Sequence, residues 1–225
     1  MTGDAAALAG ALVAANRRLF ESGVMSHSGH GNLSARLDAG RMLLTTVGTL
    51  GGLSAGDLAV VGFDGTDPDG RLHPAAREIV GMHAVVYEER PDAGAVIHTH
   101  SPAVTGFAVA GRPLPCRYEA LLRFGQAADV PLVPWAPRGS PESVKGIAEA
   151  MHRESETSAV LLGNHGLLVW GPDAGAAAAL TVAIEEAADA EWRAAALGGS
   201  APFPPGALEA VRASVRAADR VARGR

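Results

Sequence analysis

Two histidines separated by one residue follow a short apolar run in the middle of the chain. The run covers residues 95–97 and leads into His98 and His100 within the segment GAVIHTHS. Its β-branched residues predict a buried strand, and residues i and i+2 of a strand point to the same face. Both imidazoles therefore converge, where they can bind a divalent metal or transfer protons near neutral pH. The alternative is two polar residues that end a strand.

A third histidine, His165, lies in the tight segment Gly163–Gly166 between two further apolar runs. The runs predict two strands joined by this turn, and the glycine beside His165 leaves room for its ring. His165 can complete a three-histidine set with His98 and His100. Three protein ligands with one open position are typical of a catalytic metal site. Such a set accepts zinc, iron(II), manganese or cobalt.

The segment SHSGHGNLS at residues 26–34 combines two glycines with small polar residues. Backbone N–H groups in such a loop can approach a ligand closely and bind an anion. Gly31 and Asn32 are therefore candidate substrate contacts, and His30 is a candidate acid/base or substrate contact. The alternative is an ordinary tight turn.

The composition limits the classes of function. The chain has 225 residues, 48% of them hydrophobic, and a net charge of −5, which indicates a sizeable core. The sequence has no cluster of Lys and Arg, so we do not expect nucleic acid as a partner. Cys116 is the only cysteine, which excludes an internal disulfide and a cysteine-based zinc site. No signal-peptide pattern is seen, and no apolar run approaches the roughly 20 residues that span a bilayer. We expect a cytoplasmic protein without a membrane partner.

The remaining pattern predicts the elements that position the histidines. We expect helices over residues 4–22, 75–89, 102–109, 140–152, 173–197 and 207–221, and strands over 33–37, 41–46, 58–63, 95–97, 130–133, 159–162 and 167–170. Residues 118–124 fit either a strand or a helix. Short turns between the first three strands favour an antiparallel sheet. We expect one domain over 1–198, followed by a linker and tail helix over 199–225.

Four segments resemble the class II aldolase/adducin family in order and spacing. They are GNLSARL (31–37), LLTTVGTL (43–50), MHAVVYEERPDAGAVIHTHS (82–101) and LLGNHGLLVWG (161–171), and the resemblance covers nearly the whole chain. It implies a single α/β domain with a mainly antiparallel central sheet flanked by helices. It also implies that His98, His100 and His165 bind one divalent metal, with zinc expected first. A homotetramer with its sites at subunit interfaces is implied as well.

The resemblance implies a metal-dependent lyase that acts on a small molecule. In the family's aldolases the metal chelates a carbonyl and a neighbouring hydroxyl oxygen, and as a Lewis acid it stabilises the charge that develops when a C–C bond breaks. The same electron sink serves decarboxylation of a 3-oxo acid. Aldol chemistry and decarboxylation therefore both remain open.

The expected acid/base residue departs from the family pattern. The family's glutamate lies four residues before the histidine that corresponds to His83, and here that position is Ile79, whereas Glu78 lies one residue earlier. A one-residue shift on a helix rotates a side chain by about 100°. Glu78 can fill the catalytic role if it lies in a loop or first turn; otherwise it is a helix-start glutamate favoured by the dipole. His83 is expected to be a core or supporting residue.

Tyr118 lies eighteen residues after His100. Its spacing resembles that of the tyrosine which, in the family's sugar-phosphate aldolases, reaches the neighbouring subunit's site and protonates the leaving group. The alternative is a buried aromatic at an interface.

The residues that hold phosphate in those aldolases are replaced here. A Ser/Thr-Gly pair becomes Val47-Gly48, and two serines before the glutamate become Ala76-Arg77, so three hydroxyl donors are missing. A phosphate dianion needs several charge-assisted hydrogen bonds, whereas Arg77 offers a planar fork for a carboxylate. We expect a non-phosphorylated, carboxylate-bearing substrate that contacts Gly48 and either Arg77 or the glycine-rich loop. The alternative is a solvated Arg77 at a helix start.

Two other functions remain open. One is a non-haem iron oxygenase on an aromatic or hydroxy acid, with iron held by the three histidines and Glu78. The other is a non-catalytic interaction domain like the adducin head, against which the intact histidine set argues. Metal analysis and oxygen consumption would separate these alternatives.

Overall fold

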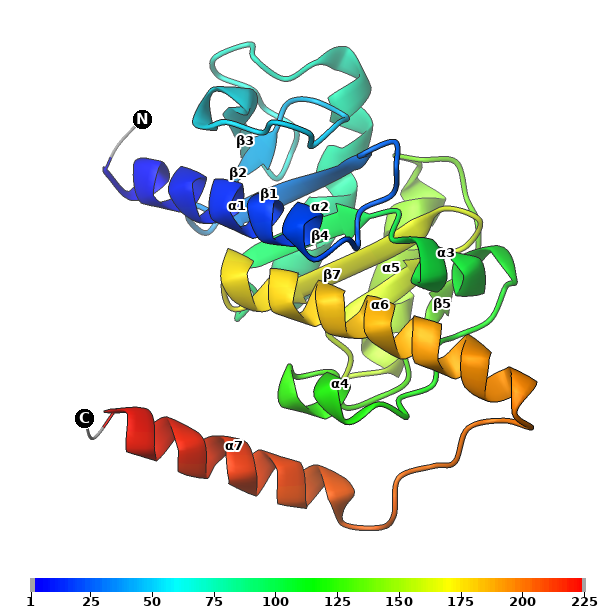
Figure 1. The fold of residues 1–225 in the computed structure, drawn as a ribbon. Helices are drawn as coiled ribbons and strands as arrows, with labels where there is room; N and C mark the ends of the chain where they lie inside the picture. The colour runs from blue at the N-terminus through cyan, green and yellow to red at the C-terminus, as the bar shows by residue number, and fades with distance from the viewer. Residues whose placement is uncertain (1–2, 224–225) are drawn as a thin grey trace.

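The strand that contains His98 lies at the centre of a seven-stranded sheet in the computed structural model, which describes residues 3–223 (Figure 1). The strands are β1 (Gly31–Arg36), β2 (Arg41–Thr45), β3 (Leu58–Gly62), β4 (Ala95–Thr99), β5 (Leu132–Val133), β6 (Ala159–Leu162) and β7 (Gly166–Gly171). Their order is β3-β2-β1-β4-β7-β6-β5. All neighbours pair antiparallel except β5 and β6. The predicted α/β class with a mainly antiparallel sheet is confirmed.

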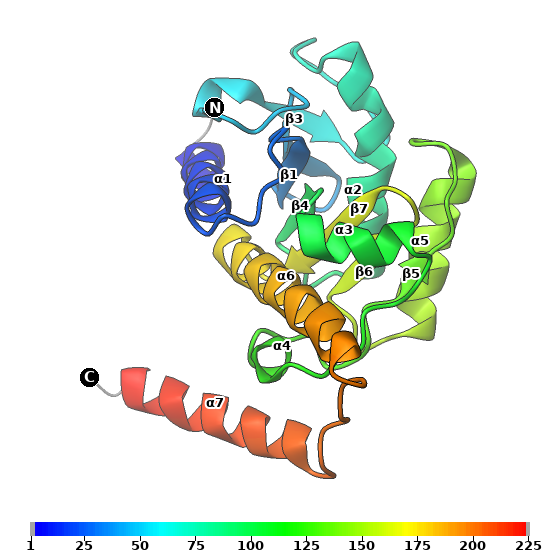
Figure 2. The same ribbon diagram turned by 45° about the vertical axis from the view of Figure 1, so that its right-hand side comes forward.

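Helices cover both faces of this sheet. They are α1 (Gly3–Glu21), α2 (Arg77–Glu89), α3 (Pro102–Val109), α4 (Glu119–Arg123), α5 (Pro141–Arg153), α6 (Ala174–Ala196) and α7 (Ala207–Arg223), with short 3₁₀ turns η1 (Ala55–Asp57) and η2 (Pro74–Ala76). Helices α1 and α6 lie on one face, and α2 and α5 lie on the other (Figures 1 and 2). Within residues 3–223, no helix has both the length and the apolar character that a membrane crossing requires.

Strand β4 has a different core on each of its faces. Ala95 and Ile97 pack with α1 and α6, whereas Val96 packs with α2 and α5. Because side chains alternate along a strand, His98 follows Val96 and points to the α2 side. The pairing places His98 opposite Asn32 of β1 and Leu168 of β7. The sheet register therefore decides which polar groups surround His98.

Helix α7 lies beside α4, apart from the sheet (Figure 1). Leu208 and Val211 pack partly buried against the core cluster that α4 and α6 share, and Arg212 forms an ion pair with Glu156 at 2.6 Å. Residues 199–206 connect it to α6. The division into a 1–198 domain and a 199–225 tail stays a prediction.

Three segments differ in detail from the expected elements. The ambiguous residues 118–124 contain the short helix α4. Strand β5 is shorter than 130–133 because Pro131 has no N–H to donate, and Val130 pairs with Leu114 in an isolated bridge instead. The helix expected from residue 75 begins with the 3₁₀ turn η2, so α2 itself starts at Arg77.

Candidate metal centre and substrate cavity

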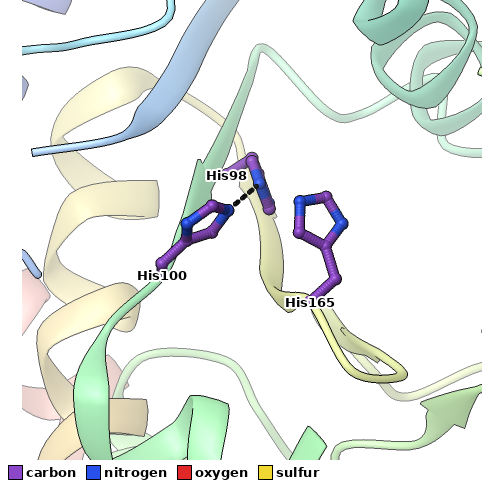
Figure 3. Close-up of side chains that lie close together, drawn as sticks. All are labelled: His98, His100 and His165. Carbon is purple, nitrogen blue, oxygen red and sulfur yellow. Dashed lines mark hydrogen bonds between the residues drawn. The ribbon is translucent and has the colours of Figure 1, made fainter. Parts of the chain in front are cut away.

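The fold brings the three histidines into one cluster (Figure 3). Their candidate ligand nitrogens all lie within 4.8 Å of one another, and Nε2 of His98 is 3.1 Å from Nε2 of His100. A tetrahedral zinc with Zn–N bonds of about 2.0–2.1 Å separates its ligand nitrogens by about 3.3–3.4 Å. The cluster therefore fits a single divalent metal.

A hydrogen bond to the backbone fixes the tautomer of His98. Its Nδ1 lies 2.9 Å from the carbonyl oxygen of Leu167. Because a carbonyl oxygen only accepts, Nδ1 carries the proton and Nε2 keeps its lone pair. Metal-binding histidines commonly have this kind of support. His98 is thus prepared to bind a metal through Nε2.

The turn between β6 and β7 brings His165 to the other two rings. Asn164 has a left-handed backbone with a φ of 54°, which asparagine tolerates better than most residues. A Cβ on Gly166 would lie 2.5 Å from the oxygen of Thr99 and 2.9 Å from Cδ2 of His100. A glycine is required here because the turn passes so close to the end of β4.

Burial keeps the three histidines neutral near pH 7. Desolvation, with smaller effects of His165 and His100, lowers the pKa of His98 well below its usual value. Desolvation, followed by the charges of His100 and Arg138, lowers the pKa of His165 to about 4. Desolvation is also the largest cause of the lowered pKa of His100. The neutral ring is the form that binds a metal.

A line of buried hydrogen bonds orients Asn32 beside His98. Nε2 of His83 lies 2.6 Å from Oδ1 of Asn32, Nδ1 of His83 lies 2.7 Å from Oγ of Ser34, and Oγ of Ser34 lies 2.7 Å from the hydroxyl of Tyr87. Burial lowers the pKa of His83 to about 3, so its ring is neutral. The amide oxygen only accepts, so His83 donates to Asn32, Ser34 donates to His83, and Tyr87 donates to Ser34. Nδ2 of Asn32 remains a donor.

The triad cavity, defined here as the hollow next to the three histidines, has a volume of about 210 Å³. Its wall contains the candidate contacts His30, Gly31, Asn32 and Gly48. Ile79 also lines it, at the position where the family pattern expects a glutamate. The further lining residues are Thr46, Val47, His73, Ala75, Ala76, His98, His100, Arg138 and His165.

Glu78 lies in a second, adjoining cavity of about 350 Å³. His165 and Arg138 line both cavities. Oε2 of Glu78 accepts a hydrogen bond from Nε of Arg138 at 2.7 Å. Glu78 is in the first turn of α2, a position compatible with the expected catalytic role, but it lines this second cavity and not the triad cavity that Ile79 lines. Its role as acid/base stays a prediction.

Arg77 and Tyr118 line neither of these two cavities. The side chain of Arg77 is 55% exposed, and its Nη2 lies 3.7 Å from Oδ2 of Asp67. The hydroxyl of Tyr118 is 3.4 Å from Oε2 of Glu186 on the surface of α6. The structure thus brings together His30, Gly31, Asn32 and Gly48 with the triad, and leaves Arg77 and Tyr118 outside. Their contact with a substrate remains a prediction.

Two titratable residues that line the triad cavity, Arg138 and His73, were missed by the sequence analysis. Arg138 lies in the segment PWAPRGS, and His73 precedes η2, where its Nδ1 accepts from the N–H of Ala75 at 3.2 Å. The proline and glycine residues around Arg138 signal a loop. Nothing in the spacing links that loop to the histidines, because the contact depends on how α5 packs against α2.

The chain is similar in sequence and in fold to known proteins of one family. The family model of the Class II Aldolase and Adducin N-terminal domain matches residues 10–192. The chain is 31% identical over 195 residues to a 5-methylthioribulose-1-phosphate/5-deoxyribulose-1-phosphate aldolase of Rhodospirillum rubrum, with 86% of this chain and 84% of the relative covered. It is 33% identical over 187 residues to a 3-oxo-tetronate 4-phosphate decarboxylase of Haemophilus influenzae, covering 79% and 83%. A solved L-fuculose 1-phosphate aldolase superimposes with a TM-score of 0.80 at 25% identity, covering 93% and 96%.

We predict that the protein binds about one divalent metal per chain and that the His98/His100/His165 triple alanine variant binds none. Gly166→Ala should lower metal affinity more than about 10-fold without removing a ligand, because its Cβ displaces His100 and the end of β4. Elemental analysis and competition with a chelator measure this. His152→Ala, which removes an exposed histidine on α5, is the control. Stoichiometric metal in the triple variant would refute the ligand assignment.

We predict that His83 makes stability fall in acid. Its pKa is about 3 in the folded protein and about 6.5 when unfolded, so between these values the unfolded chain binds the extra proton. The free energy of unfolding should therefore fall as the pH drops below about 6.5, by up to about 1.4 kcal/mol per pH unit from this residue. Urea titrations of metal-free wild type and His83→Gln measure the difference. Parallel curves for the two proteins from pH 7 to 4 would contradict it.

Proposed function

The chain belongs to the class II aldolase and adducin family and is a class II aldolase-like lyase, and we propose that its substrate is a small, non-phosphorylated hydroxy or oxo carboxylate. The reaction is aldol-type cleavage or formation of a C–C bond, or decarboxylation. The observation that carries the proposal is the cluster of His98, His100 and His165 at the wall of a cavity that also holds the Asn32 amide. We propose one divalent metal at this cluster, with zinc first and iron, manganese or cobalt as substitutes.

Several residues of the chain have separate roles around that metal. When bound, the metal supplies Lewis-acid stabilisation of the negative charge that develops on a substrate oxygen. Asn32, held by His83, donates from Nδ2 to a substrate oxygen. The backbone of Gly31 and Gly48 lets the substrate approach β1 and the following turn closely. His30 contacts the substrate from the same side, since its ring centroid is 6.3 Å from that of His100.

Glu78 is proposed as the residue that takes and returns a proton. It shares a cavity with His165 and Asn164, and its Oε2 is held by Arg138. Oε1 has no hydrogen-bond partner among the described residues. A positioned general base of this kind contributes about 10²- to 10⁴-fold to a rate.

The case for an unphosphorylated substrate rests on hydrogen-bond donors that are missing from the triad cavity. The names of all three relatives reported above contain a phosphate. In this chain Val47 and Ala76 line the cavity without a hydroxyl, and the Thr46 hydroxyl donates to the oxygen of Asp57 at 3.0 Å. Each charge-assisted hydrogen bond contributes about 1.5–3 kcal/mol, so two or three missing bonds weaken phosphate binding strongly.

The oxygenase and scaffold alternatives have less support. Among the described residues, the group that can hold a metal contains three histidines and no carboxylate. Glu78, which the oxygenase hypothesis uses as a ligand, is paired with Arg138. The scaffold hypothesis leaves the histidine cluster without a role.

A matched pair of substrates tests the proposal. We expect the metal-loaded protein to turn over 3-oxo-tetronate, or an unphosphorylated 4-hydroxy-2-oxo acid, at least about 100-fold faster than the corresponding phosphate ester, given two lost charge-assisted bonds. Release of CO₂ or of an aldehyde distinguishes decarboxylation from aldol cleavage. Glu78→Gln should lower kcat by about 100-fold or more, and His152→Ala should not change it. Efficient turnover of the phosphate ester would refute the substrate class.

We also propose a homotetramer in which Tyr118 protonates the leaving group in a neighbouring subunit's site. The support is its position: Tyr118 is 38% exposed and lines neither of the two cavities described above. Exposed apolar side chains on α3 and α6, Val109 at 59% and Trp192 at 52%, offer surface for association.

We expect light scattering to give a tetramer and Tyr118→Phe to lower kcat by about 100-fold without changing the assembly. Co-assembly of Tyr118→Phe with His98→Ala subunits should restore part of the activity, because mixed interfaces combine an intact tyrosine with an intact metal cluster. A stable, active monomer at micromolar concentration would contradict this arrangement.

A further inference from the structure

Arg138 brings a positive charge to the triad cavity. Among the described residues that line this cavity, it is the only arginine or lysine, and no aspartate or glutamate is present. It lies between β5 and α5, in the loop formed by residues 134–140. An anionic group that enters beside the histidines therefore meets one permanent cation of the protein.

Close backbone contacts hold this loop at both ends. Gly139 has a φ of 76°, and a Cβ there would lie 2.9 Å from the oxygen and 3.0 Å from the Cα of Glu78. A Cβ on Gly163 would lie 2.9 Å from the nitrogen of Trp135. Just after Arg138, Ser140 caps α5 by accepting from the N–H of Ser143 at 3.1 Å. The loop is thus packed against the start of α2 on one side and the His165 turn on the other.

The contacts of the guanidinium leave part of it available for a ligand. Nε donates to Oε2 of Glu78 at 2.7 Å. Neither Nη has a hydrogen-bond partner among the described residues, and the side chain is 54% exposed. Two parallel N–H groups on a planar fork match the two oxygens of a carboxylate. Glu78 can therefore hold the guanidinium through Nε while both Nη groups face a ligand.

We propose that Arg138 binds the carboxylate of the substrate through its two Nη groups, while Glu78 positions the guanidinium through Nε. This inference rests on the proposed function and specifies its substrate as an acid whose carboxylate lies beyond the oxygens that reach the histidines. Arg77, which the sequence suggested for this role as an alternative to the glycine-rich loop, lies beside Asp67 instead. Arg138 is thus a residue that determines specificity, and Glu78 has a positioning role in addition to its proton transfer.

The test compares ligands that differ only in their far end. Malate and 2-hydroxybutyrate share a 2-hydroxy acid group for the metal, but malate ends in a carboxylate where 2-hydroxybutyrate ends in a methyl group. 3-Phosphoglycerate carries a phosphate ester at that end. Calorimetric titration of the zinc-loaded protein with both enantiomers of each acid gives the dissociation constants. The visible spectrum of the cobalt-loaded protein reports independently whether the hydroxy acid reaches the metal.

We expect wild type to bind malate at least about 10-fold more tightly than 2-hydroxybutyrate. Arg138→Gln should bring this ratio close to one and leave 2-hydroxybutyrate binding unchanged. Arg77→Gln, which removes another exposed arginine next to Glu78, is the matched control and should keep the ratio. Glu78→Gln should also keep it, because its amide oxygen still accepts from Nε, whereas Glu78→Ala should lower it several-fold.

If zinc-loaded Arg138→Gln keeps the wild-type preference for malate over 2-hydroxybutyrate, the role of Arg138 is overturned. The proposed function is not affected by that result. Tighter binding of 3-phosphoglycerate than of malate would overturn the choice of a carboxylate. Wild-type protein that holds no stoichiometric metal would overturn the proposed function. Metal analysis tests this independently of the ligand titrations.

Discussion

The pairing of β4 with β1 on one side and β7 on the other is the constraint on which the site depends. It places His98 opposite Asn32 and Leu168, and it brings the Leu167 carbonyl within reach of Nδ1 of His98. A slip of one residue would turn His98 into the apolar layer under α1 and α6. That layer contains Ala95 and Ile97 among the apolar side chains of α1 and α6. Burial of the two core faces therefore fixes the orientation of the metal ligand.

Burial also determines the direction of every proton in the line from Tyr87 to Asn32. A buried polar group without a partner costs about 1–3 kcal/mol, and Tyr87, Ser34, His83 and Asn32 each find one in this line. Because the last member can only accept at its oxygen, the order of donors is fixed back to the tyrosine. An interior requirement of the fold thus determines what the Asn32 amide offers to a ligand at the surface.

The sequence was sufficient to predict the placement of a side chain where the hydrophobic pattern of one segment determines it. Alternation along β4 placed His98 and His100 on one face, and the apolar runs around His165 predicted its turn. It was insufficient where an outcome depends on packing between distant segments. The hydrophobic pattern of residues 118–124 did not distinguish a strand from a helix. Pro131 shortened β5 because it has no N–H to donate to the neighbouring strand. Arg138 reaches the histidines only because the loop before α5 packs against α2, and no spacing within the sequence encodes that contact.

The departure from the family pattern at residues 78 and 79 and the loop arginine Arg138 form one connected arrangement. With Ile79 on the cavity wall, the preceding residue is rotated by about 100° around α2, which turns Glu78 toward the loop of Arg138. Its carboxylate is there the acceptor for Nε of Arg138. Gly139 permits this because any side chain at that position would collide with the backbone of Glu78. The displaced glutamate and the loop arginine are therefore best understood as a pair, in which the position of one charge depends on that of the other.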